Sequence, residues 1–191
     1  MRRVRTVDEK DARPMTIPVD KLHHHHPRIR AQDWRSPLVA RLTNGAAYAD
    51  GNAYLSDSFR PKDADPTDGK LPLAWSGLRT DYELCIKTYQ TNVLTEFAAL
   101  AVACILVNRR AGLEITEVTR RGDKVDYWIG DRELLLEVSG TQNGDLAALC
   151  DSKADGQLLK NPFNKDGFVC VSRFSSPAAR LWYYKHPGSS S

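Results

Sequence analysis

The stretch VDYWIGDRELLLEVSGT, Val125 to Thr141, places two carboxylates, Asp126 and Glu137, inside a strongly apolar run. Its two halves, KVDYWI (124–129) and ELLLEVS (133–139), have the aromatic, leucine and valine content of short β-strands. Three consecutive leucines make the second half apolar on both faces, which indicates a central strand. A carboxylate buried on such a strand needs a metal ion, a cationic side chain or a proton beside it.

The Gly-Asp pair at 130–131 predicts a two-residue hairpin turn between the halves. In that register Asp126 faces Leu135 and Lys124 faces Glu137, so the two carboxylates are diagonal neighbours on one sheet face. Their Cα atoms would lie about 7–8 Å apart, which suits a shared metal ion. A loop with an odd residue count would put them on opposite faces. The competing interpretation is a half-exposed hairpin whose charged face is only solvated.

The elements around this hairpin form an ordered series from residue 81 onward. An alanine-rich, proline-free segment (81–112) predicts a buried helix that ends at Arg109, Arg110 and Gly112. After it the sequence predicts strands at 113–119, 124–129 and 133–139, a helix at 145–161 that starts near Asp145, and strands at 168–174 and 179–185.

The first 80 residues have a different character, because seven of the ten prolines lie before residue 75. Proline disfavours long helices, so we expect an irregular N-terminal extension with short extended pieces and an exposed loop. The pieces are predicted at 15–19, 36–43 and 52–56, and the loop at 60–72. We therefore expect an N-terminal arm over residues 1–80 and a core domain over residues 81–191.

The series of helix, three antiparallel strands, helix and strand, with Asp126 on the second strand and Glu137 on the third, resembles the PD-(D/E)xK nucleases. The resemblance to this restriction-endonuclease-like superfamily covers roughly residues 81–185 and implies an α/β fold of that type. In the family the two acids bind magnesium or manganese, and a glutamate on the first helix often completes the metal shell. The implied metal ligands are therefore Glu96, Asp126 and Glu137, although Glu96 also fits the exposed edge of its helix.

The sequence departs from the family two residues after Glu137, where Ser139 stands in place of the motif lysine. Serine cannot supply the positive charge that stabilises a developing phosphorane. In the predicted helix DLAALCDSKADGQLLK, Lys153 and Gln157 share a stripe with apolar residues at helical spacing, which aims both at the hairpin. Relocation of the lysine onto this helix also occurs in the family. Lys124 is a second candidate, and either lysine could instead point to solvent.

Composition restricts the class of protein further. The chain has 191 residues, 27% charged residues, a net charge of +3 and a mean hydropathy of −0.47, which is typical of a soluble protein that tolerates a polyanionic partner. There is no CxxC pair, so the four cysteines are expected to be buried free thiols: Cys85, Cys104, Cys150 and Cys170.

No targeting segment is apparent in the sequence. The N-terminal stretch MRRVRTVDEKDARP lacks the apolar region of a secretory signal, and the apolar run 97–107 is too short to span a bilayer. We therefore expect a cytoplasmic protein without a membrane partner. The tract His23–His26 is expected to be exposed, without a defined metal site. The stretch RIRAQDWR (28–35) suits either phosphate contact with base stacking or an arm that packs its tryptophan on the domain.

The resemblance, together with these patterns, implies a Mg²⁺- or Mn²⁺-dependent nuclease that acts on DNA or RNA, DNA being the more expected substrate. Its catalytic residues would be Asp126, Glu137, Lys153 and Gln157. Such a small chain would work as a homodimer or within a larger complex. The alternative, favoured by Ser139, is a catalytically silent module of the same fold that binds nucleic acid or assembles a complex. An α/β domain with an unrelated role is a third possibility.

Overall fold

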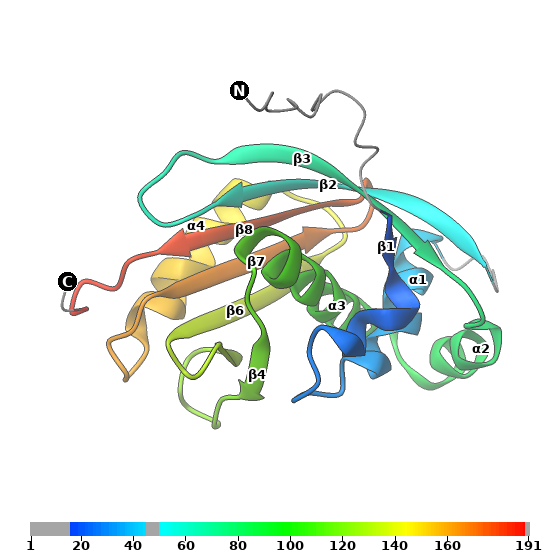
Figure 1. Ribbon diagram of the computed structural model, residues 1–191, viewed down its shortest axis with the longest axis horizontal. Coiled ribbons are helices and arrows are strands. Elements are labelled where there is room, and N and C mark those ends of the chain that lie inside the picture. The colour runs from blue at the N-terminus through cyan, green and yellow to red at the C-terminus, as the bar shows by residue number, and fades with distance from the viewer. Residues whose placement is uncertain (1–15, 45–49, 190–191) are drawn as a thin grey trace, which may run out of the picture.

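The computed structural model describes residues 16–44 and 50–189; the N-terminal stretch assessed above for a signal lies outside this part. The strands, shown in Figure 1, are β1 (Ile17–Pro18), β2 (Gly51–Arg60), β3 (Thr67–Trp75), β4 (Ile115–Val118), β5 (Tyr127–Ile129), β6 (Leu134–Thr141), β7 (Gly167–Arg173) and β8 (Ala178–Tyr184). The helices are α1 (Arg35–Leu42), α2 (Arg79–Thr88), α3 (Thr91–Ala111) and α4 (Leu146–Gly156), with short 3-10 turns η1 (Val19–His24), η2 (Ala31–Trp34) and η3 (Leu158–Lys160).

All eight of these strands form one mixed sheet in the order β1-β3-β2-β8-β7-β6-β5-β4. The predicted meander is present, because β4, β5 and β6 pair antiparallel, and β7 then pairs parallel to β6 after the α4 crossover. The protein is thus α/β with the element order predicted for residues 113–185.

Helices cover both faces of the sheet, with α3 in front of it and α4 behind it in Figure 1. Leu136, Phe168 and Leu181 belong to the core on the α3 face, whereas Leu135 and Val169 belong to a second core beneath α4. Adjacent residues of β6 alternate between these two cores, as the pleat of a strand requires. Since Glu137 follows the parity of Leu135, its side chain lies on the α4 face.

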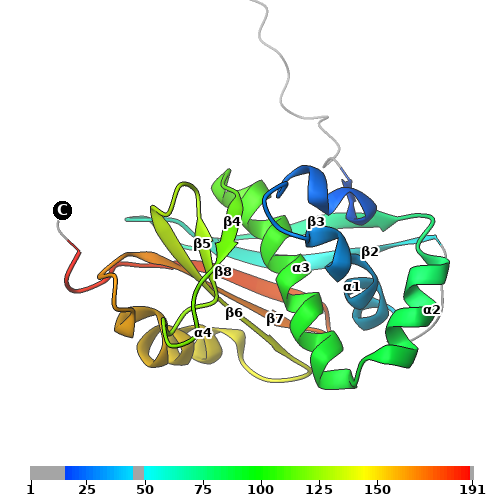
Figure 2. The same cartoon turned by 90° about the horizontal axis from the view of Figure 1, so that it is seen from below.

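The prediction of an irregular N-terminal arm is wrong, since β2 pairs with β8 and α1 packs on α3 (Figure 2). The segment 36–43, predicted to be extended, is mostly helix α1, because Pro37 lies in the first turn, where a helix tolerates proline. Part of the predicted loop 60–72 is instead the start of β3. Pro72 is accommodated there because β1 pairs only with Leu73 and Ala74, so among the described residues no strand pairs with the outer edge of β3 at Pro72. The sheet therefore runs across the boundary predicted at residue 80.

The helix predicted over 81–112 is two helices, α2 and α3, separated at the extended residues Tyr89 and Gln90. Its predicted end is confirmed, because Gly112 caps α3 in the left-handed conformation with φ 66°. By its length and its mean hydropathy of 1.6, α3 could cross a membrane. Its longest uninterrupted apolar run, 97–107, is shorter than the roughly 20 residues that span a bilayer. Of its apolar window 61% is buried inside the protein, which is typical of the core helix of a soluble protein. The four cysteines are buried and free, as predicted.

The prediction that the histidine tract is exposed is wrong for His26, which is fully buried. Its Nδ1 accepts a hydrogen bond of 3.0 Å from the Ile115 main-chain N–H, which makes Nε2 the protonated nitrogen that donates to the Cys104 carbonyl at 2.9 Å. The neutral imidazole thus joins α3 to the start of β4. Burial lowers the pKa of His26, so protonation is disfavoured in the folded protein.

Replacing His26 with alanine is expected to lower the free energy of unfolding by roughly 2–4 kcal/mol, because it leaves the buried Ile115 N–H without its acceptor, removes the hydrogen bond to the Cys104 carbonyl and opens a cavity. The exposed His24 provides the control, since His24→Ala should unfold like the wild type. Because the pKa of His26 is lower in the folded state, its contribution is present above about pH 6.5 and is lost as the pH falls further. Urea denaturation of both variants at pH 7.5 and pH 5 measures these differences.

Candidate active site

The hairpin that carries Asp126 and Glu137 has a four-residue loop, 130–133, in place of the predicted two-residue turn, since Ile129 pairs with Leu134. Both Gly130 and Arg132 adopt φ 61° in this loop. The register moves by two residues, so Asp126 comes beside Glu137 rather than diagonal to it. Because the loop length stays even, the carboxylates keep a common sheet face. The predicted pairing of Lys124 with Glu137 is therefore wrong.

Asp126 is held against β6 through its main chain and its side chain. Its N–H donates to the Leu136 carbonyl at 3.1 Å, and its Oδ2 accepts from the Val138 N–H at 2.8 Å. The carboxylate thus takes the hydrogen bond that a continued β5 strand would have accepted, which fixes it next to Glu137. Val138 was not recognised in the sequence, because main-chain donors leave no signal there.

Glu137 and Lys153 form the central ion pair of the site. The Lys153 Nζ atom lies 2.9 Å from Glu137 Oε1, and the two side chains are 30% and 6% exposed. Lys153 is on α4, whose residues Leu146, Cys150 and Ala154 pack on the sheet. The prediction that this helix brings Lys153 to the carboxylates is therefore confirmed in its geometry, while a catalytic role stays a prediction.

The ionised forms of the two carboxyls are destabilised by their surroundings. Burial and the neighbouring Asp126 charge together raise the pKa of Glu137 to about 7, against the opposing effect of the Lys153 ammonium. Burial likewise raises the pKa of Asp126, against the Val138 hydrogen bond and the Lys153 charge. The carboxyls also share a hydrogen bond. Two ionised acids beside one lysine leave an excess negative charge that a proton or a further cation would neutralise.

Two clefts adjoin this group of residues. One, of about 440 Å³, lies beside the turn 119–125 and includes Gln157 among its lining residues. The other, of about 400 Å³, lies toward α3 and is lined by Glu96 and Ser139. Asp126, Glu137 and Lys153 line both clefts. A molecule in either cleft would therefore meet the acid pair and the lysine.

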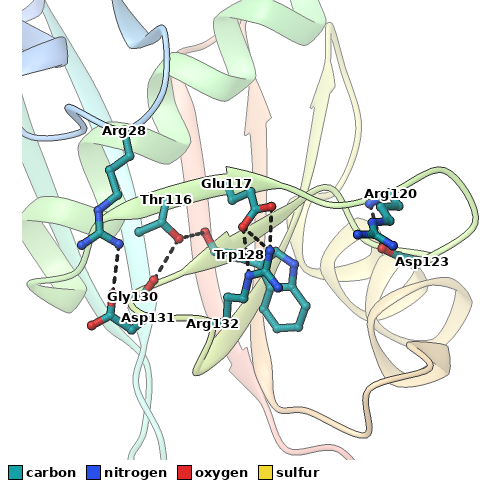
Figure 3. Close-up of polar contacts among 9 residues, drawn as sticks. All are labelled: Arg28, Thr116, Glu117, Arg120, Asp123, Trp128, Gly130, Asp131 and Arg132. Carbon is teal, nitrogen blue, oxygen red and sulfur yellow. Dashed lines mark hydrogen bonds and ion pairs between the residues drawn. The ribbon is translucent and has the colours of Figure 1, made fainter.

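The turn before Asp126 is fixed by local hydrogen bonds. The Thr119 N–H donates to the Asp126 carbonyl at 2.9 Å, and the Arg120 N–H donates to Asp123 Oδ2 at 2.7 Å (Figure 3). The arginine side chains of this turn, Arg120 and Arg121, are exposed and line the first cleft. Sequence reasoning used the RRGD stretch only as a turn signal, although its paired arginines next to the acids could have indicated a phosphate contact.

Two ion pairs fix the loop 130–133 of the hairpin. Figure 3 shows Arg132 in contact with both oxygens of Glu117, at 2.9 and 2.7 Å, and Arg28 bound to Asp131 at 2.9 Å. The RIRAQDWR stretch is therefore an arm on the domain, with Trp34 edge-on to Tyr127 at 6.1 Å.

The remaining predicted residues lie near the acids without forming a larger cluster. Glu96 is exposed on α3, and Gln157 follows the end of α4. Among residues 16–44 and 50–189, no three His, Cys, Asp or Glu side chains form a metal-binding group. The role of Glu96 as a third ligand and that of Gln157 at the phosphate stay predictions. Lys124, with φ 68°, is exposed and lines the first cleft.

Comparison of the chain with models of known protein families, with curated proteins and with solved structures gives no match.

The pKa of Glu137 leads to a pH-dependent difference between the wild type and Glu137→Gln. Because this pKa lies near 7 in the folded state and near 4.5 in the unfolded chain, the wild type loses stability as the pH rises through this window. The loss is on the order of 3 kcal/mol, and glutamine avoids it. In EDTA, the melting temperature of Glu137→Gln relative to wild type should increase by several degrees between pH 4.5 and pH 8. A difference that stays constant with pH would contradict the buried, ionisable state of Glu137.

Proposed function

We propose that the protein is a divalent-metal-dependent phosphodiesterase that cleaves nucleic acid at the Asp126–Glu137 pair. The observation that carries this proposal is the combination of two adjacent, largely buried carboxyls with Lys153 at 2.9 Å from Glu137. Buried acids with raised pKa values beside a cleft are typical of functional sites, because such an arrangement lowers stability and is retained where it serves a function. The resemblance to the PD-(D/E)xK nucleases supports the same choice of chemistry.

The donor set at the pair suits magnesium or manganese. Carboxylate oxygens are hard ligands, and Mg²⁺ is commonly bound through one or two carboxylates together with water and substrate phosphate. Asp126 and Glu137 would hold the ion, and Glu96 reaches the same cleft from α3. A divalent cation supplies polarisation of a phosphoryl oxygen and lowers the pKa of bound water. It would also balance the excess negative charge of the two ionised acids.

The residues of this chain would divide the remaining work between them. Lys153 would stabilise negative charge that develops on the phosphate, because its ammonium reaches Glu137 from the cleft side at a partly exposed position. Gln157, next to it in the first cleft, would orient the phosphate or the water. Ser139 lines the other cleft without a charge to contribute.

The direct test is a cleavage assay on single-stranded DNA, plasmid DNA and RNA with Mg²⁺, with Mn²⁺ and with EDTA. We expect cleavage of at least one substrate with metal and none in EDTA, since the acid pair alone lacks a Lewis acid. The rate should rise as the pH increases through about 7, because metal binding requires ionised Glu137. An inert protein under every metal and substrate would rule out the enzyme.

A second candidate function is a silent nuclease-fold module that binds nucleic acid or assembles a larger complex. Two observations favour it. Ser139 stands in place of the motif lysine. Among the described residues, no three His, Cys, Asp or Glu side chains form a group that could hold a metal ion. This alternative predicts nucleic-acid binding without turnover.

A further inference from the structure

The two clefts at the acid pair continue into a third along β6. The third cleft, of about 680 Å³, shares Glu96 and Gly140 with the second and extends to Thr91 and Arg41. Together the three clefts follow β6 from the turn 119–125, across the acids, to the N-terminal end of α3.

The floor of this groove is an open strand edge. β5 pairs only with Leu134–Leu136, whereas β6 continues to Thr141, so within the described residues the outer edge of β6 has no strand partner from Val138 onward. α3 forms one side, and it packs so closely that a Cβ on Gly140 would lie 2.6 Å from the Thr95 carbonyl oxygen. Lys153 on α4 lies on the other side, next to Glu137.

Cationic side chains lie at both ends of the groove and the acids lie between them. Arg120, Arg121 and Lys124 are exposed around the first cleft, and none of them forms an ion pair with a carboxylate in the described part of the chain. At the other end Arg41 donates to the Gln142 side-chain carbonyl and lies over the Phe174 ring at 5.8 Å. Its Nε is buried and, among the described residues, has no hydrogen-bond partner.

We propose that this groove binds one unpaired nucleic-acid strand, with phosphates at the 120–124 turn and at Arg41 and the intervening phosphodiester over Asp126 and Glu137. The inference rests on the proposed function and specifies its substrate. The separation of positive ends from an acidic centre matches a polyanion that is held at both ends and presented to a metal in the middle.

The recessed position of Glu137 selects a single strand over a duplex. Its side chain is only 6% exposed, at the base of a groove bounded by α3 and α4. Duplex DNA has a persistence length of about 150 base pairs, so bending its backbone locally into such a groove costs deformation energy. A single strand can follow the groove and expose its phosphates individually.

The test measures binding without cleavage, by fluorescence anisotropy of a labelled single-stranded oligonucleotide and of its duplex, in EDTA at pH 6.5. The wild type should bind the single strand at least about tenfold more tightly than the duplex. Arg41→Ala should weaken single-strand binding about fivefold and Arg120→Ala/Arg121→Ala about tenfold, and each arginine removed should reduce the salt slope by about 0.7. Arg41→Lys keeps the charge and should retain most of the affinity. It therefore distinguishes the loss of a cation from misfolding of Arg41→Ala.

The matched control is Lys62→Ala/Lys70→Ala, which removes two charges at the β2–β3 hairpin, whose two strands lie three and four positions from β6 in the sheet order. It should bind like the wild type. Equal affinity for duplex and single strand, or unchanged affinity in the arginine variants, would overturn the proposal. Single-strand binding through the groove without turnover in Mg²⁺ or Mn²⁺ would support the groove and refute the nuclease. Cleavage with unaltered binding and KM in the arginine variants would support the nuclease and overturn the groove.

Discussion

Asp126→Asn is expected to reduce metal-dependent cleavage by about 10³-fold in kcat, because removal of a charged metal ligand costs several kcal/mol of transition-state stabilisation. Asparagine is nearly isosteric, and its side-chain carbonyl can still accept the Val138 N–H that Asp126 Oδ2 accepts at 2.8 Å. The variant should therefore fold normally. The loss should appear in kcat on single-stranded DNA and in the Mn²⁺ affinity measured by calorimetry.

Asp131→Asn is the matched control for this prediction. Asp131 lies in the loop of the same hairpin, is exposed and pairs with Arg28 at 2.9 Å, outside both clefts at the acid pair. Its loss should leave kcat and Mn²⁺ affinity unchanged, since exposed ion pairs contribute little. If Asp126→Asn cleaves like the wild type while the control behaves as expected, Asp126 is not a ligand and the proposed site is wrong.

Periodicity in the sequence was sufficient to place the acids and the lysine in one site. The two-residue alternation of the strands put Asp126 and Glu137 on one face, and that conclusion survived a wrong register because a four-residue loop has the same parity as a two-residue turn. The register itself was not predictable from the Gly-Asp signal, since the loop uses a left-handed φ of 61° at Arg132. Helical spacing on α4 correctly directed Lys153 to the acids because Cys150 and Ala154 are its buried face.

The features that sequence reasoning missed depend on contacts distant along the chain. Prolines suggested irregular structure before residue 80, yet Pro37 lies in the first turn of α1, and Pro72 lies where the outer edge of β3 has no strand partner in the described part of the chain. His26 is buried because it binds Cys104 and Ile115, 78 and 89 residues away. A histidine repeat carries no sign of such partners. For the same reason Arg41, on α1, could not be assigned to the groove at β6.

Lys153→Ala is expected to reduce kcat by about 10²–10³-fold, the usual effect of removing one charged donor from a developing oxyanion. A purely structural role is distinguished by the pH profile. The Lys153 ammonium, 2.9 Å from Glu137, lowers the pKa of that carboxyl, so its removal should shift the rise of activity to higher pH. The exposed Lys160 on η3 provides a control variant, Lys160→Ala, which should change neither kcat nor the profile.

A second substitution tests whether Lys153 replaces the missing motif lysine. Ser139 is two residues from Glu137 on β6, on the same face of the strand, and lines a cleft that Lys153 also lines. Lys153→Ala combined with Ser139→Lys should therefore recover about tenfold or more of the lost rate and return the pH profile toward the wild type, because a cation near Glu137 is restored. Wild-type kcat in Lys153→Ala alone would show that no cation at this position is needed. In that case cleavage would depend on the metal and on the arginines of the groove.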